Sequence, residues 1–258
     1  YVYKRQMEVE TGNVVAMASM PDYDSNVWTK DSLPTSVWNK IMNNHLNGTI
    51  TSNSSGRSGH DFSSLVFMGS TIKPLSVLIG LNEGFFSTSS TYPDVGITYF
   101  GKDDKSSVRN SSGHVYGKLY PADAIKQSSN VFMVDMVGKQ LYKKYLGDKG
   151  VEVWDQYMKK FGLGVSTQSG LPGESPGQIN YTDFKAAGSS QAALVYASFG
   201  QQGSYTTLQL AQYATTLANE GVRIKPQRIS KITDAQGKVV KEFKKEVLNK
   251  VTFDKSFW

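Results

Sequence analysis

The sequence predicts a mixed α/β domain of the α+β type, in which strands at both ends of the chain enclose a helical middle. Two segments, residues 7–18 and 228–243, are typical of hairpins, because each has strand-like apolar residues on both sides of a Gly-containing turn. Between them, apolar residues recur at the three- and four-residue spacing of amphipathic helices. We expect the terminal strands to share one antiparallel sheet, with the helices packed on it or forming a lobe to one side.

Composition limits the classes of function to consider. The 258 residues are 39% hydrophobic and 19% charged, which suits one large globular domain. No apolar run reaches the roughly 18–20 residues that cross a bilayer. The absence of Cys excludes disulfides, thiol catalysis and Cys-based zinc sites, and His45, His60 and His114 lack a metal-binding spacing. The lysines behind the net charge of +6 are scattered, so we expect no nucleic-acid partner, no metal and no cofactor.

The first hairpin is predicted from local pattern. Met7–Glu10 alternates apolar and charged residues, Thr11–Asn13 has turn chemistry, and Val14–Ala18 is an apolar strand. The preceding Tyr1–Gln6 is not typical of a first strand, and we expect it to be a non-native remnant outside the fold. Asn43–Asp61 is rich in Ser, Asn and Gly, which predicts a loop.

Four helices and a second hairpin follow. Each helix has an apolar stripe, and Gly, Pro or a capping Thr marks its ends. The second hairpin joins Arg228–Thr233 to Val239–Phe243 through Asp234–Gly237. The predicted helices are Ile72–Leu81, ending at Gly84; one that begins at Pro121 and carries Ile125 and Val131–Val134; Val151–Phe161, capped by Gly162; and Leu208–Ala218, opened by Thr206 or Thr207 and closed by Gly221.

The sharpest chemical feature is Ser70-Thr71-Ile72-Lys73 at the predicted start of the first helix. A separation of three residues places Ser70 and Lys73 on one helical face, about a turn apart. A serine hydroxyl needs a base to become a nucleophile, and a lysine whose pKa is lowered by burial can supply one. Gly69 would permit a tight approach of the backbone at this point. The alternative is that Ser70 only caps the helix and that Lys73 is solvated.

A second feature is Ser128-Ser129-Asn130, inside the second predicted helix. Ser and Asn compete for backbone hydrogen bonds in a helix interior, so three such residues in a row are unusual there. Local irregularities of this kind tend to mark function or strain. The alternative is a loop between two short helices.

In this order the two features resemble the active-site serine penicillin-binding proteins and serine β-lactamases. Further segments narrow the resemblance to the monofunctional, class B penicillin-binding transpeptidases. The resemblance runs from about residue 7 to the end of the chain. The segments that carry it are the opening hairpin Thr11–Asn26, the nucleophile segment Gly69–Pro74, Phe161–Gly164, Leu171–Glu174, Gly200-Gln201 and the late-helix segment Thr207–Ala211.

The resemblance implies the penicillin-binding fold and a peptidoglycan D,D-transpeptidase that works through an acyl-enzyme. Ser70 would attack the penultimate D-Ala of a stem peptide, and β-lactams would acylate the same hydroxyl. Lys73 would be the base, and Ser128 would relay a proton to the leaving D-Ala. Asn130 would hold the substrate amide and the Lys73 side chain. Glu174 would be a structural loop residue.

The family also implies a location and partners for the parent protein. We expect the domain to act at the extracytoplasmic face of the bacterial membrane, with its anchor outside this chain. The expected partners are stem peptides ending in D-Ala-D-Ala, β-lactams and a cell-wall synthesis complex.

Two features depart from the family pattern. The third family motif, Lys-[Ser/Thr]-Gly on a strand that lines the site, does not occur before the chain ends at Trp258. The second departure is Tyr1–Gln6. We therefore expect residues 7–258 to be a transpeptidase domain that is incomplete at the C-terminus and reacts poorly with penicillin.

Two other interpretations stay open. A β-lactam-hydrolysing or β-lactam-sensing protein would share the nucleophile, but such proteins usually lack a segment like Thr11–Asn26. A non-catalytic wall-binding scaffold would have no need of intact Ser70, Lys73, Ser128 and Asn130.

Overall fold

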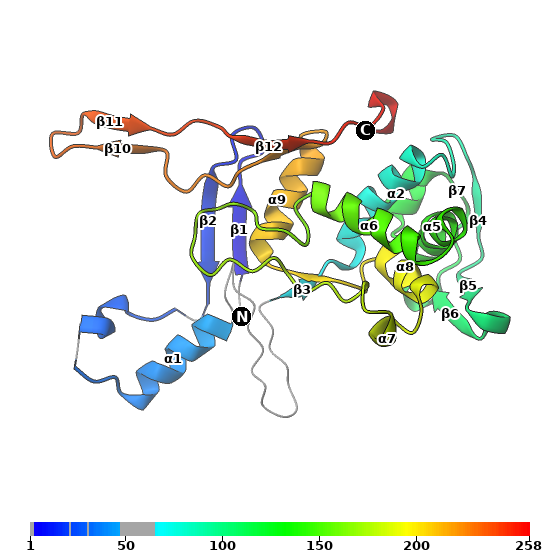
Figure 1. Ribbon diagram of the computed structural model, residues 1–258, viewed down its shortest axis with the longest axis horizontal. Coiled ribbons are helices and arrows are strands. Elements are labelled where there is room, and N and C mark those ends of the chain that lie inside the picture. The colour runs from blue at the N-terminus through cyan, green and yellow to red at the C-terminus, as the bar shows by residue number, and fades with distance from the viewer. Residues whose placement is uncertain (1–2, 21, 30, 47–64) are drawn as a thin grey trace. The chain divides into compact units, whose positions relative to one another are not determined.

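A computed structural model of the chain describes residues 3–20, 22–29, 31–46 and 65–258 (Figure 1). The chain divides into two compact units, each described here by itself. The strand unit comprises Tyr1–Val66, Phe161–Gly177 and Tyr205–Val251. The helical unit comprises Phe67–Lys160, Gln178–Ser204 and Thr252–Trp258.

The strand unit begins with an antiparallel hairpin of β1 (Tyr3–Met7) and β2 (Val14–Ser19). The predicted hairpin is confirmed, but its first strand lies earlier than expected. Glu8 starts the turn instead of continuing the strand, because its carboxylate accepts hydrogen bonds from the Thr11 hydroxyl and from Asn13 Nδ2. Residues 3–6 thus belong to the fold, contrary to the expectation that they lie outside it, and their non-native origin stays a prediction.

The other strands of this unit form separate pairs. β9 (Val222–Ile224) pairs with β12 (Val247–Lys250), and β10 (Lys231–Thr233) pairs with β11 (Val239–Glu242) as the predicted second hairpin. The expectation of one sheet shared by the terminal strands is wrong for the described residues. A single parallel bridge, Asn13 to Gln227, joins the two ends. Pro226 lacks the N–H that a continuous ladder would need between β9 and this bridge.

The main helix of the strand unit is α9 (Thr207–Ala218), which packs against β1 (Figure 1). It starts with a reciprocal capping box, in which Gln209 N donates to Thr206 Oγ1 over 3.2 Å and Thr206 N donates to Gln209 Oε1 over 2.9 Å. The buried Gln209 Nε2 also donates to the carbonyls of Val165 and Pro176. The predicted late helix, with Thr206 at its start and Gly221 after its end, is confirmed.

Two further helices lie in the N-terminal part of this unit. They are η1 (Ser25–Thr29) and α1 (Thr35–Leu46). The first four residues of the predicted Asn43–Asp61 loop therefore belong to α1, and its remainder lies outside the described residues. Among described helices, none has both the length and the apolar character that a bilayer crossing requires.

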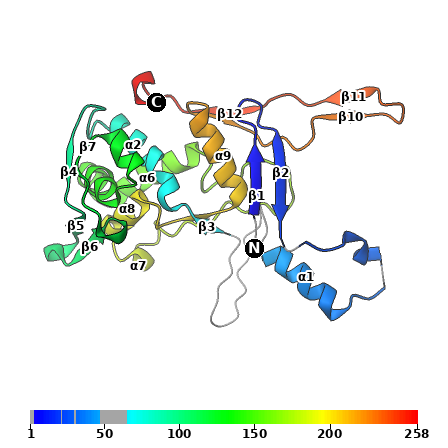
Figure 2. The same ribbon diagram turned by 180° about the vertical axis from the view of Figure 1, so that it is seen from behind.

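In the helical unit, α5 (Lys139–Tyr145), α6 (Asp148–Lys160) and α8 (Ser190–Ser198) contact one another, and α5 and α8 also contact the short segment η5 (Val134–Gly138) (Figure 1). The contact of α6 with α8 can be followed in Figure 2. Glycines permit the close contacts: a Cβ on Gly138 would lie 2.8 Å from the Leu194 carbonyl oxygen, and one on Gly150 would lie 2.8 Å from that of Leu141. Buried side chains at the centre of the unit are Ile72, Leu75, Ile79, Val131, Met133, Val137, Leu141, Trp154 and Leu194.

The helices of this unit follow the predicted order with one break. The Ile72–Leu81 and Val151–Phe161 helices are confirmed, whereas the helix predicted from Pro121 is split. The described helical segments of four or more residues are η2 (Gly69–Ile72), α2 (Lys73–Asn82), α3 (Pro121–Lys126), α4 (Asn130–Met133), the π-helical η5 (Val134–Gly138), α5 (Lys139–Tyr145), α6 (Asp148–Lys160), α7 (Phe184–Ala187) and α8 (Ser190–Ser198). The three-residue segments are η3 (Lys102–Asp104), η4 (Ser111–Gly113) and η6 (Lys255–Phe257).

Two strand pairs flank these helices. β4 (Tyr92–Asp94) pairs with β7 (Gly117–Leu119), and β5 (Ile97–Phe100) pairs with β6 (Ser106–Arg109), both antiparallel. The remaining strands, β3 (Val66–Phe67) and β8 (Ser204–Tyr205), lie where the chain passes from one unit to the other.

Gly12 offers a test of the hairpin's packing. Its φ is +79°, and a Cβ there would lie 2.5 Å from Ile224 Cγ2 and 2.8 Å from the Lys225 carbonyl oxygen. Gly237, in the β10–β11 turn, has φ +83° but open space around it. Both Gly→Ala changes should cost about 1–2 kcal/mol in backbone strain. We expect Gly12→Ala to lower the free energy of unfolding by about 1–3 kcal/mol more than Gly237→Ala, measured by urea denaturation. Equal losses would contradict this packing.

Candidate active site

The Ser70–Lys73 segment lies where η2 runs into α2. Gly69 has φ +52°, which favours glycine, and the Thr71 hydroxyl donates to the Met68 carbonyl over 2.7 Å. Ser70 is exposed to solvent, whereas Lys73, at the first position of α2, is only 1% exposed. The helix start predicted at this point is confirmed, and the alternative of a solvated lysine is wrong.

The end of α8 holds this segment in place. Gly69 N donates to the Gly200 carbonyl over 3.0 Å, and Ser76 Oγ donates to the Ser198 carbonyl over 2.7 Å. A Cβ on Gly200 would lie 2.0 Å from the Gly69 carbonyl oxygen, whereas one on Gly69 would meet nothing within 4 Å. The tight approach expected at Gly69 therefore depends on Gly200, which lies against it from a segment about 130 residues further on.

The second motif forms a turn between α3 and α4 and is not the helix interior that the sequence predicts. Ser128 N donates to the Ile125 carbonyl over 3.0 Å and Ser129 N to the Ala124 carbonyl over 2.9 Å. These two bonds form a Schellman motif at the end of α3. Ser128 lies at the position where such motifs usually have glycine, and its φ is +55°. The alternative of a loop between two short helices is thus the correct interpretation of the local structure.

The four residues predicted to form the site lie together. Lys73 Nζ donates to the Ser128 carbonyl over 2.6 Å, to Ser128 Oγ over 2.9 Å and to Asn130 Oδ1 over 2.7 Å. Ser128 Oγ in turn donates to Ser70 Oγ over 2.8 Å. The structure thus brings Ser70, Lys73 and Ser128 within or near hydrogen-bond reach, as their motifs predict, with Ser128 Oγ bonded to both of the others.

The surroundings of Lys73 favour its neutral form. All three oxygen atoms that accept from its ammonium group are uncharged, so no opposite charge offsets the loss of water. Burial accordingly lowers the pKa of Lys73 from 10.5 to about 8. Roughly one molecule in ten then has a neutral Lys73 amine at pH 7, compared with about one in three thousand for an ordinary lysine.

A neutral Lys73 amine would complete a path for a proton. The Ser128 hydroxyl lies between the other two groups, 2.8 Å from Ser70 Oγ and 2.9 Å from Lys73 Nζ. If Ser70 gives its proton to Ser128 Oγ, the Ser128 proton can pass to the lysine. The arrangement can therefore turn the exposed Ser70 hydroxyl into a nucleophile.

Two residues that sequence reasoning missed support the second motif. Asp94, at the end of β4, accepts from Ser129 Oγ over 2.5 Å, and Asn110 Oδ1 accepts from Asn130 N over 2.8 Å. Both are buried polar residues, with Asp94 0% and Asn110 3% exposed. The only local signal is that a Gly follows each at short range, and that signal is equally typical of an ordinary turn.

Glu174 has the structural role predicted for it. In the strand unit its carboxylate accepts from Ser166 Oγ over 2.9 Å, from Thr167 N over 2.6 Å and from the Thr167 hydroxyl. These bonds close the loop that carries Leu171–Glu174. Over the described ranges, no group of three or more His, Asp or Glu side chains could hold a metal ion.

The chain matches one protein family over nearly its whole length. Residues 6–258 match the family described as the penicillin-binding protein transpeptidase domain. The chain belongs to this family. The resemblance to class B penicillin-binding transpeptidases is thereby confirmed.

Two curated proteins illustrate the similarity of the chain to penicillin-binding proteins and D,D-transpeptidases. The chain is 34% identical to penicillin-binding protein 2A of Bacillus subtilis over 202 residues, which cover 74% of this chain and 27% of that protein. It is 27% identical to peptidoglycan D,D-transpeptidase FtsI of Escherichia coli over 238 residues, which cover 86% of this chain and 34% of that protein. The chain thus spans about a third or less of the length of these curated relatives.

Solved structures confirm the predicted fold class. Penicillin-binding protein A from M. tuberculosis, solved as an imipenem acyl-enzyme complex, superposes with a TM-score of 0.72 at 18% identity. The superposition covers 95% of this chain and 52% of that one. At 18% identity this similarity shows that the two proteins share a fold.

The backbone at Ser128 leads to a test that separates strain from chemistry. Ser128→Ala removes the hydroxyl but keeps a Cβ at φ +55°, whereas Ser128→Gly removes both. We expect both variants to lose the proton path equally. The Gly variant should be more stable than the Ala variant by about 0.5–1 kcal/mol, after the entropy that glycine loses on folding. Thermal unfolding measures the difference, and an Ala variant at least as stable as the Gly variant would contradict the strain.

Proposed function

We propose that this domain forms peptide cross-links in peptidoglycan as a serine D,D-transpeptidase. The observation that carries the proposal is the continuous set of hydrogen bonds from Ser70 Oγ through Ser128 Oγ to the buried Lys73. The acceptors around Lys73 are uncharged and its pKa is lowered to about 8, so Lys73 is suited to act as a base close to neutral pH.

The first chemical step is acylation of Ser70. Ser70 Oγ attacks the carbonyl carbon of the penultimate D-Ala while its proton passes to Ser128 and the Ser128 proton passes to Lys73. The Ser70 N–H stabilises the oxyanion of the tetrahedral intermediate as one donor. When the intermediate collapses, Lys73 returns a proton through Ser128 to the departing amine of the terminal D-Ala, which leaves an ester on Ser70.

The second step transfers the peptide. An amine from a neighbouring stem peptide attacks the ester carbonyl, and its proton follows the same path to Lys73. Collapse of this intermediate forms the new amide bond, and the proton returns to Ser70 Oγ. Lys73 and Ser128 therefore end the cycle in their starting protonation states.

In this proposal Asn130 has two roles, to orient Lys73 and to bind the substrate. Its Oδ1 accepts from Lys73, and its Nδ2 donates to the Arg109 carbonyl over 3.0 Å. These two bonds fix the side-chain amide and leave one N–H on Nδ2 for a substrate carbonyl. Asn130 thus orients Lys73 first and binds substrate with its remaining donor.

The family supports further proposals for the whole protein. β-Lactams resemble the D-Ala-D-Ala end and would acylate Ser70, as the imipenem acyl-enzyme of the M. tuberculosis protein illustrates for that relative. We also propose that the protein acts at the outer face of the bacterial membrane through an anchor elsewhere in its chain, within a cell-wall synthesis complex.

Covalent labelling of the full-length protein with a fluorescent penicillin tests the roles of Ser70 and Lys73. Ser70→Ala should abolish labelling, because the hydroxyl is the atom that is acylated. Lys73→Ala should slow it by about 10²–10⁴-fold, because proton transfer loses its acceptor. Lys105→Ala, on the exposed surface, is the control and should label normally. Labelling that persists in Ser70→Ala would refute the proposed nucleophile.

The pH dependence of acylation tests the protonation state of Lys73. Below pH 8 most molecules have a protonated Lys73, which cannot accept a proton, so the acylation rate should rise with pH to a plateau with an apparent pKa of about 8. Asn130→Asp places a carboxylate against Lys73 and should move the midpoint upward by about one pH unit or more. Stopped-flow acylation rates from pH 6 to 10, with thermal unfolding at each pH as the control, measure both effects. A rate that is flat across this range would show that Lys73 is not the titrating base.

A further inference from the structure

Asp94 is a fully buried carboxylate that the mechanism does not use. It is 0% exposed, and all of its partners in the structure are uncharged donors. Its oxygens accept from Gly96 N over 2.9 Å, from Asn110 Nδ2 over 2.8 and 3.0 Å, and from Ser129 Oγ over 2.5 Å. A buried carboxylate is costly unless such bonds satisfy it, so this arrangement requires a reason.

Asn110 connects Asp94 to the start of α4. Its Nδ2 donates to Asp94 and to the His114 carbonyl, which leaves Oδ1 as the acceptor that faces α4. That oxygen accepts from Asn130 N over 2.8 Å and from Val131 N over 3.2 Å. The first two N–H groups of the helix, which have no partner within it, are therefore bound by one side chain.

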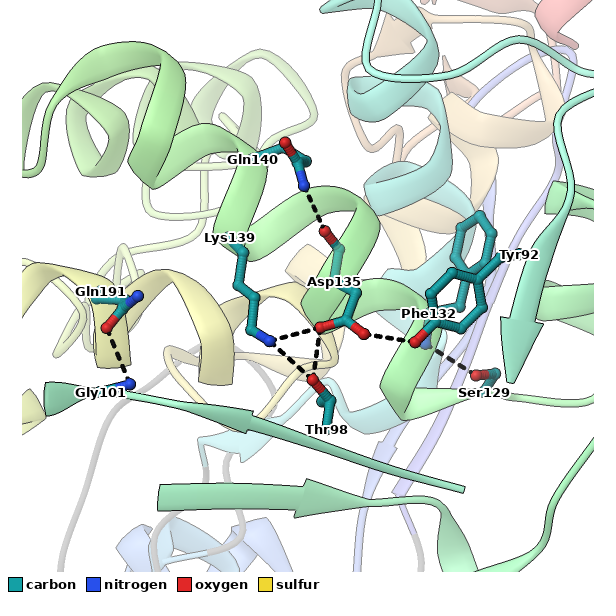
Figure 3. Close-up of polar contacts among 9 residues, drawn as sticks. All are labelled: Tyr92, Thr98, Gly101, Ser129, Phe132, Asp135, Lys139, Gln140 and Gln191. Carbon is teal, nitrogen blue, oxygen red and sulfur yellow. Dashed lines mark hydrogen bonds and ion pairs between the residues drawn. The ribbon is translucent and has the colours of Figure 1, made fainter. Parts of the chain in front are cut away.

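Ser129 completes the cap of α4. Its Oγ accepts from Phe132 N over 3.0 Å (Figure 3). The same hydroxyl donates a hydrogen bond to Asp94 Oδ2 over 2.5 Å. One hydroxyl thus serves as a helix cap and as a donor to the buried carboxylate. Asp94, Asn110 and Ser129 together satisfy the first three N–H groups of α4, and we name these three residues the anchor.

β4 also holds the same helical run at a second point. Tyr92, two residues before Asp94, donates its hydroxyl to Asp135 Oδ2 over 2.5 Å in η5 and packs edge-on against Phe132 at 5.5 Å (Figure 3). Asp135 is further bound by Lys139 and Thr98. β4 therefore contacts the helical run both at the start of α4 and one turn further on.

The position of this helix start decides the contacts of Lys73. All three acceptors of the lysine belong to Ser128 and Asn130, the residues on either side of Ser129. Ser128 is held at φ +55°, a strained conformation that persists only where its surroundings fix it. The three residues of the anchor are all buried, with exposed fractions of 0–3%.

We propose that Asp94 and Asn110, acting through Ser129, are positioning residues that hold Ser128 and Asn130 in register with Lys73. They touch neither Ser70 nor the reacting atoms. The inference rests on the proposed transpeptidase function and adds to it a reason for serine at the middle position of the second motif.

Asp94→Asn is an informative change because every partner of this carboxylate is a donor. An asparagine of the same size offers one acceptor and one donor group. If the new NH₂ group takes the place of Oδ1, it faces the donors Gly96 N and Asn110 Nδ2. If it takes the place of Oδ2, it faces the donors Asn110 Nδ2 and Ser129 Oγ. Ser129→Ala is the second variant, since it removes the shared hydroxyl without changing the charge.

Glu83→Gln provides a matched control in the same unit. Glu83 is a second carboxylate with little exposure, 8%, and it accepts from Lys144, Tyr145 and Tyr157. Within the described residues, none of these side chains forms a hydrogen bond with Ser128, Ser129 or Asn130. Loss of this carboxylate should lower thermal stability without changing acylation.

The experiment measures acylation of the full-length protein by a fluorescent penicillin, with the acylation rate constant resolved from non-covalent affinity. We expect Asp94→Asn and Ser129→Ala to reduce the rate constant by about 10- to 100-fold, because a small displacement misaligns the proton path. Non-covalent affinity should fall much less than the rate constant, because Asn130 supplies only one of the substrate contacts, and the pH midpoint of acylation should shift as the contacts of Lys73 change. Glu83→Gln should keep both the rate and the midpoint.

The outcomes separate this inference from the function on which it rests. A folded Ser129→Ala protein with a normal rate constant and pH midpoint would overturn the inference, and this variant decides the matter if Asp94→Asn does not fold. Rates lowered equally in Glu83→Gln would also overturn it, because the effect would then be a general loss of stability. Labelling that survives in Ser70→Ala would instead overturn the proposed function itself.

Discussion

The burial of Lys73 against three uncharged oxygen atoms is the interaction on which the rest of the site depends. An ammonium group without water and without a counter-ion is costly, so its acceptors must be placed within a few tenths of an ångström. All of them come from the turn around Ser128, 55 or more residues away in the sequence. The start of α2 and the turn between α3 and α4 therefore have to be held rigidly. This requirement explains why polar groups with no part in the chemistry are buried beneath the site.

Backbone contacts do much of this holding, and they leave little room for adjustment. The Gly69 and Gly200 backbones lie directly against each other, so no side chain between them can adapt to a change. On the other side, the end of α3 forces Ser128 into a left-handed conformation, which aims both its carbonyl and its hydroxyl at Lys73. Strained residues of this kind cluster at active sites, where geometry matters more than stability, and we apply the same reason to this serine.

The sequence predicts the parts of this structure that depend on local pattern. The stripes of α2, α6 and α9 repeat at helical spacing, and Thr206 with Gln209 forms the cap typical of a helix start. It predicts the break at Ser128 only as an alternative to a continuous helix, because the stop signal at that position is normally glycine. It does not predict Asp94 or Asn110, since their role arises only when β4 and the start of α4 meet. The first strand ends at Met7, earlier than predicted, because Glu8 forms its hydrogen bonds with residues of the turn. An alternation of apolar and charged residues carries no information about such bonds.

The fully capped start of α4 has a consequence for molecular recognition. A stem peptide that ends in D-alanine carries a terminal carboxylate, and so does a penicillin. Two groups near Ser70 could have attracted that charge: the positive end of α4 and the ammonium of Lys73. Asn110 and Ser129 already occupy the first three N–H groups of the helix, and the lysine protons are directed to Ser128 and Asn130. If the domain has the proposed function, its selectivity for a free chain end would come from donors other than these. The groups proposed to perform the chemistry would then be separate from those that recognise the substrate's charge.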